Sequence, residues 1–332
     1  MSKNLIAVTV MVLAASSVRA QDVSEMSRPV STYSIVARDS VTGHMGVAVQ
    51  SHWFSVGPIV PWAEAGVGAI ATQSFVKIDY GPDGLRRLRS GVTPREALNA
   101  MLAADPGREV RQVAIVDAQG RVAAHTGDRC IAYANHLTGP GFSVQANLME
   151  DSTVPRAMYD AFLNATGPLA ERMIAALHAA EDEGGDIRGR QSAAIVIVDG
   201  ERHEKAWQGR LLELRVEDHP LPVDELERLY RLQVAYDWVN QGDVYAEHGQ
   251  WDSAAVAYAK GEQLAPQIVE LPFWHAVTLA SQGKIDEALP IFERVFRAED
   301  RWVELVPRLV PAGLLPDDTD LMERILSVSP ER

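Results

Sequence analysis

The side chains best suited to chemistry are hydroxyl groups at the start of a β-like run. The stretch STYSIVAR opens with Ser31, Thr32 and Ser34, where an apolar strand pattern begins. Such a hydroxyl is a poor nucleophile until a base takes its proton, and the α-amine of the same residue serves as that base once the residue is the first of the chain. An α-amine has a pKa of about 8, so a useful fraction is neutral. Thr32 is therefore a candidate N-terminal nucleophile.

The surrounding pattern predicts the strand that must carry this residue and a second strand returning beside it. Runs of β-forming residues at 32–38 and 45–51 flank a turn that contains Gly43. Further β-like runs occupy 66–73, 111–127, 142–149 and 192–207, of which the second and fourth are hairpins, and helical patterns occupy 81–91, 93–105, 153–165 and 168–184. Because most adjacent strands have hairpin-length links, we expect an α+β domain of antiparallel sheets with helices outside.

The sequence gives less support to a metal site or to a catalytic cysteine. His44, His52, His125 and His136 stand singly, without the spacing of metal ligands, so we expect structural histidines, no metal site and no cofactor. Cys130 is the only cysteine, which rules out an internal disulfide. A catalytic Cys130 remains an alternative to a buried, inert thiol.

The first residues resemble an export signal. Lys3 supplies a positive charge, residues 5–15 are apolar, and Val18 and Ala20 occupy the small-residue positions before a cut. The run is too short for a spanning helix, although an uncleaved anchor is the alternative. We therefore expect a signal peptide over 1–20, a flexible lead-in or propeptide over 21–31, and a periplasmic or secreted protein.

The charge of the chain argues against two kinds of partner. The formal net charge is −14 at pH 7, with 45 acidic and 31 basic residues. A surface of this sign repels nucleic acid and anionic lipid. We expect neither as a partner.

A second, helical domain is expected over 222–330. The stretch WVNQGDVYAEHGQWDSAAVAYAKGEQLAP resembles a tetratricopeptide repeat, and a weaker copy follows 34 residues later. Its small residues at helix contacts include Gly242 and Ala254 in the first copy and Ala288 in the second. Ordinary helical hairpins are the alternative interpretation. Helices at 224–234 and 301–328 are expected to cap the ends, and the repeats favour a protein partner.

Several blocks of the chain together resemble the bacterial family catalogued as "domain of unknown function 1028". They include TYSIVARDSVTGHMGVAVQSHWFSVGPIVPWAEAGVGAIATQ, YGPDGL, TGPGFSVQANLM and GGDIRGRQSAA, in order over about 31–218. The resemblance implies the N-terminal-nucleophile hydrolase fold for 32–220, a sandwich of four layers, α-β-β-α. It also implies that Thr32 is the nucleophile.

The chain departs from the simplest family pattern at its start. Thr32 lies eleven residues beyond the predicted signal cut, so a further cut after Ser31 is required to free its amine. That cut is either self-catalysed or made by another protease. Without it, the stretch is a strand start rich in β-forming residues and carries no chemistry.

Five further residues are candidates for the same site. Ser51 ends the second strand where proteasome-like enzymes place a polar partner for the nucleophile. Asn147 offers an amide to an oxyanion, as a backbone N–H would. Arg38, Arg190 and Ser34 are candidates for substrate binding, the arginines through their planar guanidinium groups. A structural hydrogen-bonding role is the alternative for each of them.

Two functions follow from these observations. The first is an exported amidohydrolase that cleaves a C–N amide bond in a small molecule or peptide through an acyl-enzyme on Thr32. The second is a non-catalytic scaffold of the cell envelope that works through the helical repeat domain. The sequence identifies neither the substrate nor the oligomeric state, and a homo-oligomer is compatible with both functions.

Overall fold

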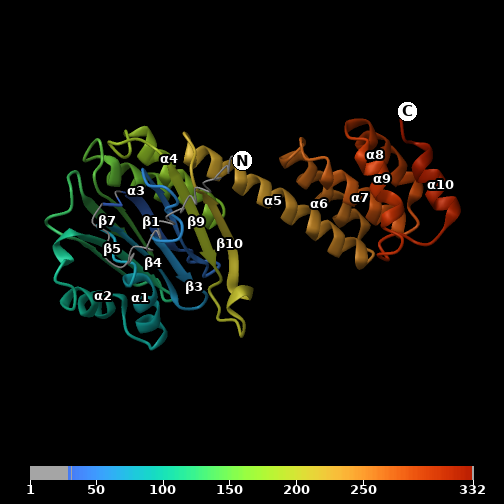
Figure 1. The fold of residues 1–332 in the computed structure, drawn as a ribbon. Helices are drawn as coiled ribbons and strands as arrows, with labels where there is room; N and C mark the ends of the chain where they lie inside the picture. The colour runs from blue at the N-terminus through green and yellow to red at the C-terminus, as the bar shows by residue number, and fades with distance from the viewer. Residues whose placement is uncertain (1–28, 31, 331–332) are drawn as a thin grey trace, which may run out of the picture. The chain divides into compact units, whose positions relative to one another are not determined.

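The computed structural model describes residues 29–30 and 32–330, and the predicted signal peptide and most of the lead-in lie outside them (Figure 1). The chain divides into two compact units. The first comprises residues 1–190 and 195–213, and the second comprises residues 191–194 and 214–332. Within the described residues, no helix is both long enough and apolar enough to cross a membrane.

The first unit is built on a six-stranded sheet with β1 near its middle. In spatial order the strands are β10 (Arg210–Val216), β9 (Ser192–Val198), β2 (Met45–Ser51), β1 (Thr32–Arg38), β8 (Phe142–Ala146) and β7 (Asn135–Gly139). β1 pairs antiparallel with β2 and with β8, and β8 pairs antiparallel with β7. The register places Thr32 opposite Ser51, so the first residue of β1 meets the last residue of β2.

A four-stranded sheet faces the first one. Each strand is antiparallel to its neighbour, in the order β3 (Pro61–Glu64), β4 (Gly68–Ser74), β5 (Arg111–Asp117) and β6 (Val122–Thr126). β1 packs against β4 and β5 across the space between the sheets. Since β1 is thereby covered on both faces, its first six residues are all buried.

Helices cover the outer face of each sheet (Figure 1). The helices and short 3-10 turns of this unit are α1 (Tyr80–Arg89), α2 (Pro94–Ala103), η1 (Arg108–Val110), α3 (Val154–Asn164), α4 (Leu169–Asp182) and η2 (Ala206–Gly209). α1 and α2 pack on the four-stranded sheet, and α3 and α4 pack on β1, β2, β7 and β8. The expected α+β architecture with antiparallel sheets is confirmed.

Local signals explain where α2 begins. The Thr93 side chain accepts a hydrogen bond from the Glu96 backbone N–H, and the Glu96 side chain accepts one from the Thr93 N–H. Pro94 occupies the first helical position, where a missing N–H has no cost. These contacts form a capping box, which fixes the start of the helix expected over 93–105.

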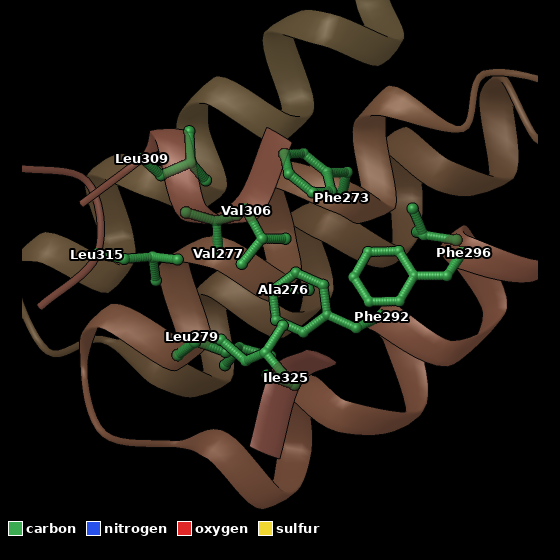
Figure 2. Close-up of a cluster of buried hydrophobic side chains, with 13 residues drawn as sticks. Phe273, Ala276, Val277, Leu279, Phe292, Phe296, Val306, Leu309, Leu315 and Ile325 are labelled. Atoms are coloured by element: carbon green, nitrogen blue, oxygen red, sulfur yellow. The ribbon is translucent and has the colours of Figure 1, made fainter. Parts of the chain in front are cut away.

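The second unit is helical, as predicted in outline. Its elements are α5 (Pro222–Glu247), α6 (Trp251–Leu264), α7 (Glu270–Ser281), α8 (Ile285–Ala298), α9 (Arg301–Leu305), η3 (Val306–Arg308) and α10 (Thr319–Ser327). α5 packs along α6, and α7 packs along α8. Figure 2 shows the core around α7 and α8, where Phe273 meets Phe292 and Phe292 stacks on Phe296.

One expected boundary is wrong. A separate capping helix was expected over 224–234, but α5 continues without a break for 26 residues. The physical reason is plain in the sequence, because neither proline nor glycine occurs between Pro222 and Gly242 to end the helix.

Candidate functional site

Thr32 lies between the two sheets, at the first position of β1. Its hydroxyl donates a hydrogen bond to the Val30 carbonyl at 2.7 Å, and Oγ1 lies 3.3 Å from Ser51 Oγ. Side chains alternate along a strand, so Thr32 and Ser34 face the four-stranded sheet while Tyr33 faces the helices. The candidate nucleophile and its predicted partner Ser51 are thus brought together.

The backbone carbonyl of Thr32 is held by three donors. Gln73 Nε2 donates to it at 3.1 Å, the Asn147 N–H at 3.1 Å and Asn147 Nδ2 at 3.3 Å. These donors come from β4 and from the residue that follows β8. The start of β1 is therefore fixed to both sheets at once.

A buried network of glutamines extends this contact. Gln73 Oε1 accepts from Ser34 at 2.6 Å, and its Nε2 donates to Gln112 Oε1 at 2.7 Å. Gln145 Nε2 donates to Ser34 Oγ at 2.6 Å. All of these side chains are fully buried, so Ser34 belongs to the network that joins the sheets rather than to a surface that meets substrate.

Three members of the site were not predicted from the sequence, namely Gln73, Gln112 and Gln145. Each stands in a strand that is almost entirely buried, as in GAIATQS, RQVAIVD and FSVQA. A polar amide within a buried strand must find hydrogen-bond partners. That rule is the signal that would have marked these three residues.

Asn147 is positioned differently from its expected role. Its Nδ2 already donates to Thr32 O and, at 3.0 Å, to Gln112 Oε1, so both amide hydrogens are engaged. Its Oδ1 is buried and has no hydrogen-bond partner among the described residues. In this form of the chain Asn147 orients Thr32 and has no free donor for an oxyanion.

Thr32 does not lie at the opening of a pocket, although a nucleophile must be accessible to its substrate. Its side chain is fully buried, and Val30 covers the site. Val30 forms a β-bridge with Ser74, donating to Ser74 O at 2.7 Å and accepting from Ser74 N–H at 3.1 Å. Val30 is therefore held beside the Thr32 hydroxyl in the uncut chain.

A family model matches residues 32–226 of this chain, under the description "Family of unknown function (DUF1028)". The chain belongs to the DUF1028 family. A solved structure, that of protein SPO2555 from Silicibacter pomeroyi, also described as DUF1028, is 32% identical. The similarity has a TM-score of 0.54 and covers 60% of this chain and 88% of that one. No match is found among the curated proteins.

The limits of the DUF1028 match agree with the geometry of the site. The match begins at Thr32, the first residue of β1, and ends at residue 226, within the first turns of α5. Both sheets lie inside it, together with Ser51, Gln73 and Asn147, whereas Val30 lies just before it. Most of the helical unit lies outside.

Arg38 does not come near Thr32 in the DUF1028 domain. It ends β1, six residues along the strand, which corresponds to about 20 Å. There it lines a polar pocket together with Gly43, Gln119 and Arg202. The whole length of the strand therefore separates Arg38 from Thr32.

Arg190 lies on the other side of the six-stranded sheet from the Thr32 hydroxyl. It forms an ion pair with Glu181 of α4, which also accepts a hydrogen bond from the Tyr33 hydroxyl. Burial, and next the neighbouring Glu181, raise the pKa of Tyr33 well above its usual value. Arg190 therefore belongs to a network of polar side chains on the helix-covered face of β1.

Cys130 is partly buried close to the end of β4. Its thiol donates to the Arg111 carbonyl at 3.4 Å. Burial raises the pKa of the Cys130 thiol, which keeps it protonated and weakly nucleophilic. Among the described residues, no group of three or more His, Cys, Asp or Glu side chains could hold a metal ion.

Proposed function

We propose that this chain is an exported amidohydrolase that cleaves a C–N amide bond through Thr32 as an N-terminal nucleophile. The observation that carries the proposal is the placement of Thr32, as the first residue of a central strand, with its hydroxyl 3.3 Å from Ser51 Oγ and its carbonyl held by Gln73 and Asn147. This chemistry requires the nucleophile to be the first residue of the chain, so that its own α-amine can act as the base.

The reaction begins once the bond between Ser31 and Thr32 is cut. Until then the Thr32 nitrogen is part of an amide and cannot act as a base. In the cut chain the neutral α-amine takes the Oγ1 proton, and Oγ1 attacks the substrate carbonyl carbon. The C–N bond then breaks, the leaving amine takes the proton from the α-ammonium, and the acyl group stays on Oγ1 as an ester. Water hydrolyses this ester to a carboxylic acid and restores the hydroxyl.

Ser51 and Asn147 have supporting roles in this scheme. Ser51 Oγ is close enough to Thr32 Oγ1 to hold it and to relay its proton. Asn147 holds the Thr32 carbonyl, and its Oδ1 faces the same buried region without a partner among the described residues. We propose that Oδ1 accepts a hydrogen bond from the freed α-amine, which would orient the base toward the hydroxyl.

The wider architecture is consistent with this proposal. Two facing sheets with helices outside suit the four-layer N-terminal-nucleophile hydrolase fold. The predicted signal peptide over 1–20 would bring the chain to the periplasm or the outside of the cell. There the uncut form would be inert and the cut form active.

A scaffold function is the second candidate, and the helical unit favours it. α5 with α6 and α7 with α8 form two helix pairs, as tetratricopeptide-like repeats would. A Cβ added to Gly242 would lie 2.6 Å from a Tyr258 ring atom, so the glycine permits close helix packing. Under this proposal the repeats hold a protein partner, and Thr32 stays covered throughout.

One experiment separates the two candidates. The mass of the mature exported chain gives its first residue: Thr32 supports the enzyme, and Gln21 supports the scaffold. A β-lactone probe then tests reactivity, and peptide mapping should find the label on Thr32. Thr42→Ala, in an exposed turn, is the control that leaves labelling intact. A mature chain that starts at Thr32 yet takes no label would refute the amidohydrolase.

A further inference from the structure

The segment before Thr32 occupies a specific position on the four-stranded sheet. Val30 pairs with Ser74 through both backbone groups, with N–H···O=C distances of 2.7 and 3.1 Å. The Val30 side chain is fully buried. The same Val30 carbonyl accepts the Thr32 hydroxyl at 2.7 Å. Val30, the second residue before the bond to be cut, is therefore held at the site by strand pairing.

β3 is too short to pair with the part of the β4 edge that contacts Val30. β3 pairs with β4 only from Gly68 to Ala71. One residue later the Thr72 N–H still donates to Val60 O on that edge, at 3.2 Å. Ser74 lies two residues further, so its N–H and C=O point to the same edge, beyond the end of β3. Val30 takes the place that a longer β3 would have filled.

We infer that this edge is the acyl-binding site of the enzyme and that its substrate is an extended peptide. The residue second from the amide to be cleaved would pair with Ser74 and place a small apolar side chain where Val30 now lies. This inference rests on the proposed function, since it takes Thr32 as the nucleophile. When the cut releases Val30, the Ser74 N–H and C=O lose their partners.

The chemistry of the vacated edge explains why a peptide fits it. A backbone donor and acceptor at an open strand edge bind an extended chain through main-chain hydrogen bonds, and the side-chain pockets supply specificity. Val30 is fully buried, so the pocket selects against charge at this position. A plain acyl group without a peptide backbone would leave both Ser74 groups unpaired.

The test uses a chain that is cut at a known place. Residues 28–31 are replaced by Ile-Glu-Gly-Arg, so that factor Xa leaves Thr32 first whatever the natural processing. The substrates are acetyl-Val-Ser-aminomethylcoumarin, its N-methyl-valine analogue and its acetyl-Asp-Ser analogue. The N-methyl group removes the donor to Ser74 O, and aspartate brings a charge to the buried pocket. We expect each analogue to have a kcat/KM at least about tenfold lower.

The outcomes separate this inference from the proposed function. Equal kcat/KM values for all three substrates would overturn the peptide inference and leave the amidohydrolase standing. So would a chain whose Thr32 takes the β-lactone but which hydrolyses none of them. If Thr32 does not react with the β-lactone, the proposed amidohydrolase function is refuted. Calorimetry with the free acid acetyl-Val-Ser then tests whether the β4 edge binds a peptide. If acetyl-Val-Ser binds and its N-methyl-valine analogue does not, the result supports a peptide site. If acetyl-Val-Ser does not bind, the peptide site is refuted.

Discussion

Replacing Gln73 by leucine tests whether the buried amides fix the start of β1. Leucine has a similar size but makes no hydrogen bonds. The change removes the donor to Thr32 O at 3.1 Å, the donor to Gln112 Oε1 at 2.7 Å and the acceptor for Ser34 at 2.6 Å. All three contacts are buried.

The magnitude depends on which partners are left unpaired. Thr32 O keeps both donors from Asn147, and Gln112 Oε1 keeps Asn147 Nδ2 at 3.0 Å. The Ser34 hydroxyl loses the acceptor that Gln73 supplied. One orphaned buried donor costs about 1–3 kcal/mol, so we expect the free energy of unfolding to fall by about 2 kcal/mol.

Unfolding in urea measures this fall in the free energy of unfolding. Proteolytic cleavage within residues 32–213 is the readout, so that the helical unit does not contribute to the signal. Gln119→Leu in the exposed hairpin turn is the matched control and should stay within about 0.5 kcal/mol of the parent chain. In the cut chain, labelling of Thr32 should slow by roughly tenfold, because its carbonyl is less firmly held. A Gln73→Leu chain as stable as the Gln119→Leu chain would refute the reasoning.

Three further changes have defined expectations. Thr32→Ala should abolish β-lactone labelling and lower the free energy of unfolding by about 1 kcal/mol through its lost hydrogen bond, while Thr32→Ser keeps partial labelling. Ala254→Leu should cost about 1–3 kcal/mol in thermal unfolding of the helical unit, and no loss would show that Ala254 is not at a close helix contact. Burial opposes ionisation of Asp105, but hydrogen bonds from Arg111 and Gly107 outweigh it and lower the pKa of the carboxyl. Its stabilisation is therefore present above its unfolded pKa of about 4 and is lost as the pH falls, so Asp105→Asn should flatten the acid decline in Tm between about pH 5 and 3.

Features set by neighbouring residues could be predicted from the sequence. The capping box of Thr93 and Glu96 needs only four consecutive residues, and the hairpin of β5 and β6 needs only its turn around Gly120. The pairing of Thr32 with Ser51 likewise follows from one hairpin. β3 and β7 were missed because they are short, and the polar residues of β7, of which Asn135 and Thr138 are exposed, resemble a loop.

Features set by the packing of one sheet on another could not be predicted in this way. The contact of Gln73 with Ser34 and Thr32 joins two sheets whose relative register no local pattern encodes. The position of Arg38 depends on distance along a strand. It shares a face with Thr32 by alternation, but the rise along the strand separates them by about 20 Å.

The amidohydrolase proposal and the peptide-site inference both depend on cleavage of the bond between Ser31 and Thr32. Val30 accepts the hydrogen bond of the Thr32 hydroxyl and also pairs with the edge of β4, so it lies at the place that we infer for the acyl group of a substrate. Cutting after Ser31 would therefore do two things at once, since it would free the amine that acts as the base and empty the Ser74 edge. An exported hydrolase built in this way gains activity only after its own lead-in has left, whereas a scaffold has no need for Thr32 ever to be uncovered.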